Sequence, residues 1–150
     1  MLSLILHATA GVLVTALAFY LNAHLYRGSW SGKAPSALEL AYYAIGVVSV
    51  CLGWYFNVQY TLVDYPQEAS WIHFTKLLFT NSAACSGSQD YVLANAVFFP
   101  MWVLSDGPRR GLKKPFVFFL MSLFTSFGFA MGFYLAAQER AVRYQAAHRG

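Results

Sequence analysis

Four long apolar stretches, separated by short polar connections, form the main pattern of this chain. The clearest of them follows a group of basic residues, and its residues 115–137 carry no charge. As a helix these 23 residues rise about 34 Å, enough to cross a hydrocarbon core of about 30 Å. We therefore predict an all-α, polytopic membrane protein with four transmembrane helices, over Leu4–Tyr26, Ala37–Val63, Ser88–Ser105 and Pro115–Gln138.

A shorter amphipathic segment lies between the second and third stretches. Residues Gln67–Thr80 place Trp71 and Phe74 on one side of a helix and Lys76 on another. About a dozen residues are too few to cross a bilayer, but such a helix lies well in the headgroup plane. The pattern thus predicts one short interfacial helix.

The third stretch is the shortest, with 15 residues between Asp90 and Asp106. The preceding sequence CSGSQD, residues 85–90, is predicted to interrupt helical structure. Pro100 removes a backbone hydrogen bond near the middle of the stretch, so a kink is expected there.

The composition excludes an ordinary water-soluble domain. Hydrophobic residues make up 58% of the chain and charged residues only 11%, against about 25% charged in soluble domains. The net charge of +4 does not indicate nucleic-acid binding, because the basic residues flank apolar stretches. The first apolar run is longer than a signal-peptide core, so a retained span is expected. Cys51 and Cys85 lie at different predicted depths and do not suggest a disulfide or a metal pair.

Basic residues give a preference for orientation. Four spans would put both termini on one side, with six basic residues in the first and third loops against four on the other side. This count favours a cytoplasmic position for the first and third loops and an external position for both termini. The basic tail, residues 141–150, favours the reverse, and a fifth crossing would remove the conflict.

Small residues recur at intervals of four on two of the predicted spans. In lipid, close approach of backbones at small side chains brings helices together. The pattern predicts that the second and fourth spans pack through Ser49, Gly53, Gly128, Gly132 and Ala136.

Several segments also resemble a known family. They are GWYFNVQY at 53–60, FTKLLFTN at 74–81, Asp90, RRGLKKPF at 109–116 and a last span ending in Glu-Arg. Residues 44–140 resemble the small bacterial membrane proteins of domain-of-unknown-function family 2834. The resemblance implies a membrane architecture, with the bacterial inner membrane as the expected location, and no catalytic residues. The chain then reads as one helical membrane domain: an additional span and loop at 1–36, a family-like core at 37–140, and the basic tail.

Ionisable groups near membrane spans are candidates for function. In a four-span arrangement nine polar residues fall toward one membrane face: His7, Asn57, Gln59, Asp64, Glu68, His73, Asp90, Gln138 and Glu139. Asp90 and Glu139 are the candidates for acid–base chemistry, although a charge at a helix N-terminus is the simpler reading of Asp90. Asn95, inside the third span, is expected to form an interhelical hydrogen bond.

His7 and His24 are candidates for cofactor ligation, for example of a tetrapyrrole metal, although interfacial histidines are more common. No paired-ligand spacing, HExxH, CxxC, GxSxG or GxGxxG occurs, so no metal or cofactor is predicted. The four basic residues of the third loop are expected to contact lipid headgroups: Arg109, Arg110, Lys113 and Lys114.

Three functions fit the pattern. The first is a non-catalytic accessory or structural subunit that packs against other membrane proteins or itself, with lipids as its other partners. The second is a small homo-oligomeric transporter or channel. The third is a membrane enzyme acting on a lipid-soluble substrate, which the missing motifs do not favour.

Overall fold

The computed structural model describes residues 2–149, and these residues contain helices and no strand. The predicted all-α class is confirmed. The α-helices are α1 (Leu2–Leu21), α2 (Ala37–Gln59), α3 (Trp71–Leu77), α4 (Ser82–Val92), α5 (Phe99–Asp106), α6 (Phe116–Phe124) and α7 (Phe127–Arg149). Short 3-10 turns occupy Ala23–Leu25 and Pro108–Arg110, and π-helical turns occupy Tyr60–Asp64 and Leu93–Phe98.

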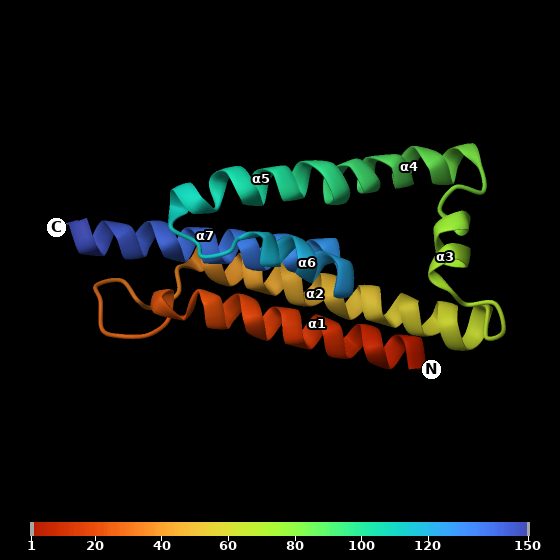
Figure 1. Ribbon diagram of the computed structural model, residues 1–150, viewed down its shortest axis with the longest axis horizontal. Coiled ribbons are helices and arrows are strands. Elements are labelled where there is room, and N and C mark those ends of the chain that lie inside the picture. Colours follow the sequence, from red (N-terminus) through yellow and green to blue (C-terminus); the bar gives the residue numbers. More distant parts are fainter. Residues whose placement is uncertain (1, 150) are drawn as a thin grey trace.

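Most helices lie roughly along one axis. In Figure 1, α1, α2, α7 and the rod formed by α4 and α5 follow the long axis, while α3 crosses it at one end. Helix α7 packs along α2, and α6 lies against α1 and α5. The most deeply buried apolar side chains, such as Val117, Met121, Ala130 and Tyr134, belong to α6 and α7. These two helices therefore form the centre of the bundle.

In the described part of the chain, residues 2–149, two helices are long and apolar enough to cross a membrane, over Leu4–Leu21 and Ala37–Asp64. Only 11% of each apolar window is buried inside the structure. Their outer faces carry many exposed large apolar side chains, among them Leu6, Val12, Ile45 and Phe56.

The predicted fourth span, Pro115–Gln138, is not one helix. The chain leaves helical geometry at Thr125, where φ is −124° and ψ is −96°, and reverses direction there. The Phe118 and Tyr134 rings lie 5.4 Å apart, whereas 16 residues of straight helix would separate them by about 24 Å. Helices α6 and α7 therefore form an antiparallel hairpin, whose tip is Thr125–Ser126.

Side-chain hydrogen bonds explain the reversal. The Thr125 hydroxyl donates to the Met121 carbonyl at 2.7 Å, and the Ser126 hydroxyl accepts from the Phe129 N–H at 3.1 Å. Ser126 thus caps a new helix where the apolar run alone suggested continuation. Charge counting and hydropathy did not register this break, because both residues are uncharged.

The reversal also places the two termini at opposite ends of the molecule (Figure 1). The expectation that both termini share one side is therefore wrong. The hairpin begins and ends at the same end of the bundle: a Cβ on Gly107 would lie 2.4 Å from the Pro115 Cβ, and Gln138 hydrogen-bonds Asp106.

The third apolar stretch is helical from Ser82 to Asp106, so the predicted interruption at residues 85–90 is wrong. Asn81 begins this rod by accepting a hydrogen bond from the Ala84 N–H at 3.0 Å. The π-helical turn Leu93–Phe98 directly precedes Pro100 and widens the helix where the proline ring would otherwise crowd it. Helix α3 occupies the centre of the predicted segment Gln67–Thr80, capped by Ser70.

The small residues of α7 lie directly against α2. A Cβ on Gly132 would lie 2.6 Å from the Tyr42 carbonyl oxygen and 3.2 Å from the Gly46 Cα, and a Cβ on Gly128 would lie 2.8 Å from the Ser49 Cβ. The Ser49 and Ser126 hydroxyls are 3.0 Å apart. Gly53 is looser, since its Cβ would lie 3.6 Å from the Ser126 Cβ, and Ala136 is fully buried.

We expect Gly132→Leu to destabilise the fold by about 3 kcal/mol, because backbone atoms of α2 cannot yield to a side chain. Thermal unfolding in mild detergent measures the effect. Gly87→Leu is the matched control, since nothing lies within 4 Å of a Cβ at that helical position. Equal midpoints for the two variants would contradict the close packing of α2 and α7.

Candidate functional site

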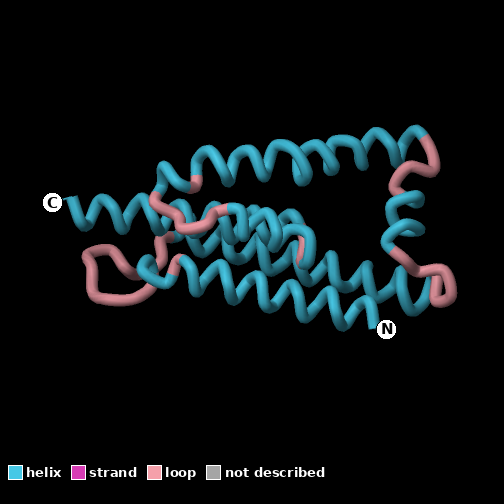
Figure 2. The backbone as a smooth tube through the Cα atoms, viewed as in Figure 1, coloured by secondary structure: helices cyan, strands magenta, loops and turns pink. Residues whose placement is uncertain are grey.

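A cavity of about 450 Å³ lies between α3 and the tip of the α6–α7 hairpin. Helices α1 and α2 and the end of α4 form its sides. Figure 2 shows loops on both sides of α3, so this short helix crosses the end of the bundle as a strap. The volume falls within the range of about 300–1,000 Å³ typical of small-molecule sites.

The hairpin tip closes the inner end of the cavity with polar side chains. Ser122, Thr125 and Ser126 face it together with Leu123. The Ser122 hydroxyl donates to Asn95 Oδ1 at 2.7 Å, which gives the buried Asn95 amide the interhelical partner expected from the sequence. Because Ser126 is the N-cap of α7, the positive end of that helix dipole points toward the cavity.

The outer end of the cavity is held by Tyr60. Its hydroxyl donates to the Ser70 carbonyl at 3.1 Å, accepts from the Ser70 N–H at 3.3 Å, and lies 3.0 Å from His73 Nδ1. His73 Nε2 is also 3.6 Å from Glu68 Oε2. These contacts fix α3 and its preceding linker over the end of α2.

The sides of the cavity carry polar groups with open hydrogen-bonding capacity. The His7 ring lies between Trp71 and Phe124 and is tilted against both, with ring centroids 5.6 and 5.5 Å away. Asn57 and Thr61 line the cavity one helical turn apart. Among the described side chains, those of residues 4–148, His7, Asn57 and Thr61 form no hydrogen bond with another residue. A bound molecule could therefore use them.

The cavity lining contains no Asp, Glu, Lys or Arg within the described chain. It also holds no acid–base pair of carboxylates, and residues 2–149 contain no group of three His, Cys, Asp or Glu side chains placed for a metal. The arrangement suits binding of a small molecule through hydrogen bonds and aromatic contacts.

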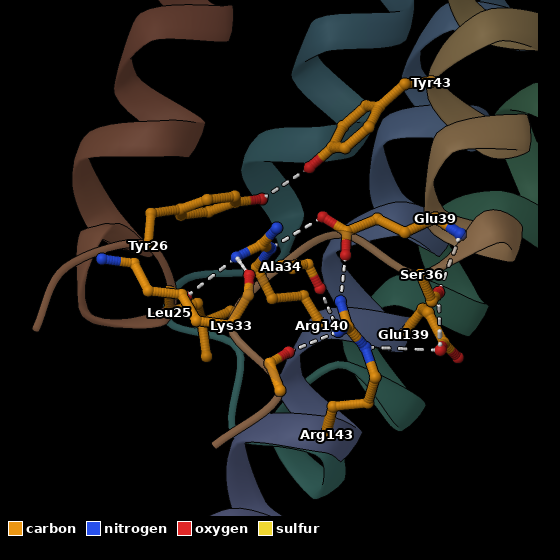
Figure 3. Close-up of polar contacts among 11 residues, drawn as sticks. Leu25, Tyr26, Lys33, Ala34, Ser36, Glu39, Tyr43, Glu139, Arg140 and Arg143 are labelled. Atoms are coloured by element: carbon orange, nitrogen blue, oxygen red, sulfur yellow. Dashed lines mark hydrogen bonds and ion pairs between the residues drawn. The ribbon is translucent and has the colours of Figure 1, made fainter. Parts of the chain in front are cut away.

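Figure 3 shows a second polar cluster. It includes the loop after α1, which lies at the end of the bundle opposite α3 (Figure 1). Glu39 is fully buried, and its Oε1 accepts from Arg140 Nε at 2.7 Å while its Oε2 pairs with Arg143. The Arg140 guanidinium lies 4.7 Å from the Tyr26 ring centroid and donates to the Lys33 carbonyl at 3.0 Å. This ion-pair network joins α2, α7 and the loop after α1.

The sequence predicted only part of the ion-pair network. The sequence places Glu39 in the first turn of the second span, where the helix dipole favours a carboxylate, and its N–H does donate to the capping Ser36 hydroxyl at 3.1 Å. Arg140 lies at the end of the predicted fourth span and Arg143 in the basic tail, so nothing in their spacing pairs them with Glu39. The missed signal is that a carboxylate one turn inside a long apolar helix needs a buried cation.

Glu139 belongs to the ion-pair network rather than to the cavity. It accepts from the Ser36 hydroxyl at 3.1 Å and lies 3.5 Å from Arg143 Nε. Asp90 is exposed on α4 and accepts from Gln89 at 2.5 Å. The two candidate carboxylates therefore lie at opposite ends of the bundle. The predicted single polar face is wrong, because the hairpin reversal carries Gln138 and Glu139 away from His7.

The two candidate histidines are also separated. His7 lines the cavity, whereas His24 follows the end of α1 and packs edgewise on Tyr144 at 5.7 Å. Burial and the nearby Lys113 lower the pKa of His24, so its neutral form is favoured. The basic residues of the loop before α6 are exposed, namely Arg109, Arg110, Lys113 and Lys114.

Comparison with known proteins identifies a family. Residues 41–140 match the family described as "Protein of unknown function DUF2834", which covers two thirds of the chain. The chain belongs to this family, as the sequence segments predicted. No curated protein and no solved structure matches the chain.

Replacing Arg140 with methionine should destabilise the protein by about 3 kcal/mol, because Glu39 would lose its main buried counter-charge. Unfolding in mixed detergent micelles measures the change in free energy. Arg109→Met, at an exposed position, should change stability by less than about 0.5 kcal/mol. Adding Glu39→Leu to Arg140→Met should recover much of the loss, and a purely additive double variant would contradict a buried pair.

Proposed function

We propose that this DUF2834 member is an integral membrane protein, of the bacterial inner membrane, that binds a small molecule in the cavity between α3 and the hairpin tip. A small transporter, the second function that the sequence pattern fits, must bind its solute in this way. The observation that carries the proposal is the cavity itself, which ends on a broken helix inside an apolar bundle.

The exposed apolar faces support a membrane location. A soluble core helix of comparable length would be mostly buried, whereas α1 and α2 expose most of their apolar length. The rod from Ser82 to Asp106 has 25 residues, about 37 Å of helix, and provides a third crossing. Helices α6 and α7 then form a re-entrant hairpin in place of a fourth span, and α3 lies in the headgroup region.

The distribution of basic residues supports one orientation for this arrangement. Loops and tail meet at one end, where Arg140 bonds the Lys33 carbonyl and Gln145 bonds the Arg110 carbonyl. Only Lys76, on α3, belongs to the other end. The remaining nine of the ten basic residues mark the cytoplasmic end: Arg27, Lys33, Arg109, Arg110, Lys113, Lys114, Arg140, Arg143 and Arg149. With the hairpin in place of a fourth span, the basic loops and the basic tail favour the same orientation.

The broken helix supports binding. In hydrocarbon, unpaired backbone groups are tolerated only where protein or a cavity surrounds them, and transporters use such breaks to form substrate sites. The break at Thr125 lies beside both α1 and α2: a Cβ on Gly11 would lie 2.6 Å from the Phe124 carbonyl oxygen, and the Ser126 hydroxyl lies 3.0 Å from that of Ser49. The cavity therefore ends partway along the bundle and stays closed toward the cytoplasmic end.

The other two candidate functions have less support. The small residues of α7, proposed for packing against partners, contact α2 of the same chain. An enzyme using Asp90 and Glu139 would need both near a common substrate, and neither lines the cavity. An accessory role stays a prediction that co-purification from mild detergent tests.

The topology predicts the accessibility of single cysteines in a variant whose native Cys51 and Cys85 are replaced. Pro108→Cys should resist a membrane-impermeant maleimide applied to intact cells, because this loop lies in the cytoplasm. Gln67→Cys, in the linker before α3, should react. Reversed labelling would overturn the orientation, and labelling of a cysteine added after residue 150 would overturn the re-entrant hairpin.

Binding is tested with a diazirine derivative of decanol as a photoreactive probe in nanodiscs. Crosslinks should concentrate on cavity residues such as Asn57 and Leu123, and excess decanol should suppress them. Thr61→Trp should reduce cavity crosslinking severalfold by filling the space, while Leu104→Trp on the exposed face of α5 should not. Crosslinks spread evenly over the apolar outer faces would overturn the proposed function.

A further inference from the structure

We infer that the cavity takes an uncharged amphiphile with a flat, oxygen-bearing ring as its head, of the lipid-soluble quinone class. This inference rests on the proposed function and names the ligand class of the same site. It follows from three independent properties of the cavity: its charge, its open hydrogen-bonding groups and its aromatic surface.

The charge of the lining favours a neutral ligand. A buried carboxylate, phosphate or ammonium is stable only beside a counter-charge, and no Asp, Glu, Lys or Arg of residues 2–149 lines the cavity. Glu68 is paired with His73 beside α3 instead. The N-terminus of α7 adds a partial positive charge, which suits the partial negative charge of a carbonyl or hydroxyl oxygen.

The hydrogen-bonding groups favour a head with oxygen atoms at more than one edge. Asn57 and Thr61 come from the α2 side, and His7 comes from α1. All three have open hydrogen-bonding capacity within the described chain, and each can donate to a carbonyl oxygen. A ring with oxygens on opposite edges can accept hydrogen bonds from the α1 side and the α2 side at once, whereas the single hydroxyl of an alkyl alcohol can reach only one side.

The aromatic groups favour a flat ring. Trp71, Phe74 and Tyr91 line the cavity, and Trp71 remains 61% exposed, so its indole face is free to stack. Leu4, Leu62 and Leu123 add apolar surface for the start of a hydrocarbon tail. A planar polar head with an apolar tail therefore matches each part of the lining.

The test is competition against the diazirine-decanol probe by three compounds that share a decyl tail: a decyl-benzoquinone, decyl phosphate and decyltrimethylammonium. The quinone should suppress cavity crosslinking at a concentration at least tenfold below that of either ion. Asn57→Leu should raise the required quinone concentration about tenfold through loss of hydrogen bonding. Gln59→Leu, which also replaces an amide of α2 with leucine but lies outside the lining, should leave the required quinone concentration unchanged.

The outcomes separate the ligand class from the site. Equal or better competition by decyl phosphate or decyltrimethylammonium, or an Asn57→Leu variant that responds like Gln59→Leu, would overturn the quinone class while the cavity still binds. Failure of the probe to label cavity residues would overturn the proposed function itself. Retention of the α2–α7 fold in both leucine variants is checked by their thermal midpoints.

Discussion

The reversal of the chain at Thr125–Ser126 is the constraint on which the rest of the structure depends. Nine residues of α6 give about 13 Å of helix, less than half of a bilayer core. The reversal lets α7 return along α2 to the end where α6 began. It places the termini at opposite ends of the bundle and leaves the cavity beyond the tip, under α3.

Two features stabilise this uncommon path. Near the tip, small residues let neighbouring backbones approach: Gly11 faces the Phe124 carbonyl, and Gly128 faces Ser49. At the far end of α7, the buried Glu39 pairs with Arg140 and Arg143. The second feature fixes the register of α7 on α2, because a shift by one turn would leave a fully buried carboxylate without a cation.

The spacing of small residues indicated the contact of Gly128 and Gly132 with α2. Apolar periodicity was sufficient to predict the helical class and the start of α2 at Ala37, although it extended the first span to Tyr26, whereas α1 ends at Leu21. It failed at residues 85–90 and at Thr125–Ser126, for opposite reasons. Gly87 and its polar neighbours suggested a break, but Asn81 caps a helix that continues through them. Thr125 and Ser126 sit in an unbroken uncharged run, and only their hydroxyl bonding to nearby backbone reveals the turn. The cavity could not be predicted, because it exists only once α6 turns back.

The two ends of the bundle divide the polar residues by the chemistry that each environment allows. At the end that holds Glu39, the buried carboxylate is in contact with Arg140 and Arg143, and Glu139 lies beside Arg143. At the other end the cavity lining is free of charge, and His7, Asn57 and Thr61 are half-buried on its walls. A polar molecule in the cavity can reach their hydrogen-bonding groups. This difference between the two ends is why the proposed ligand site lies at the end opposite Glu39.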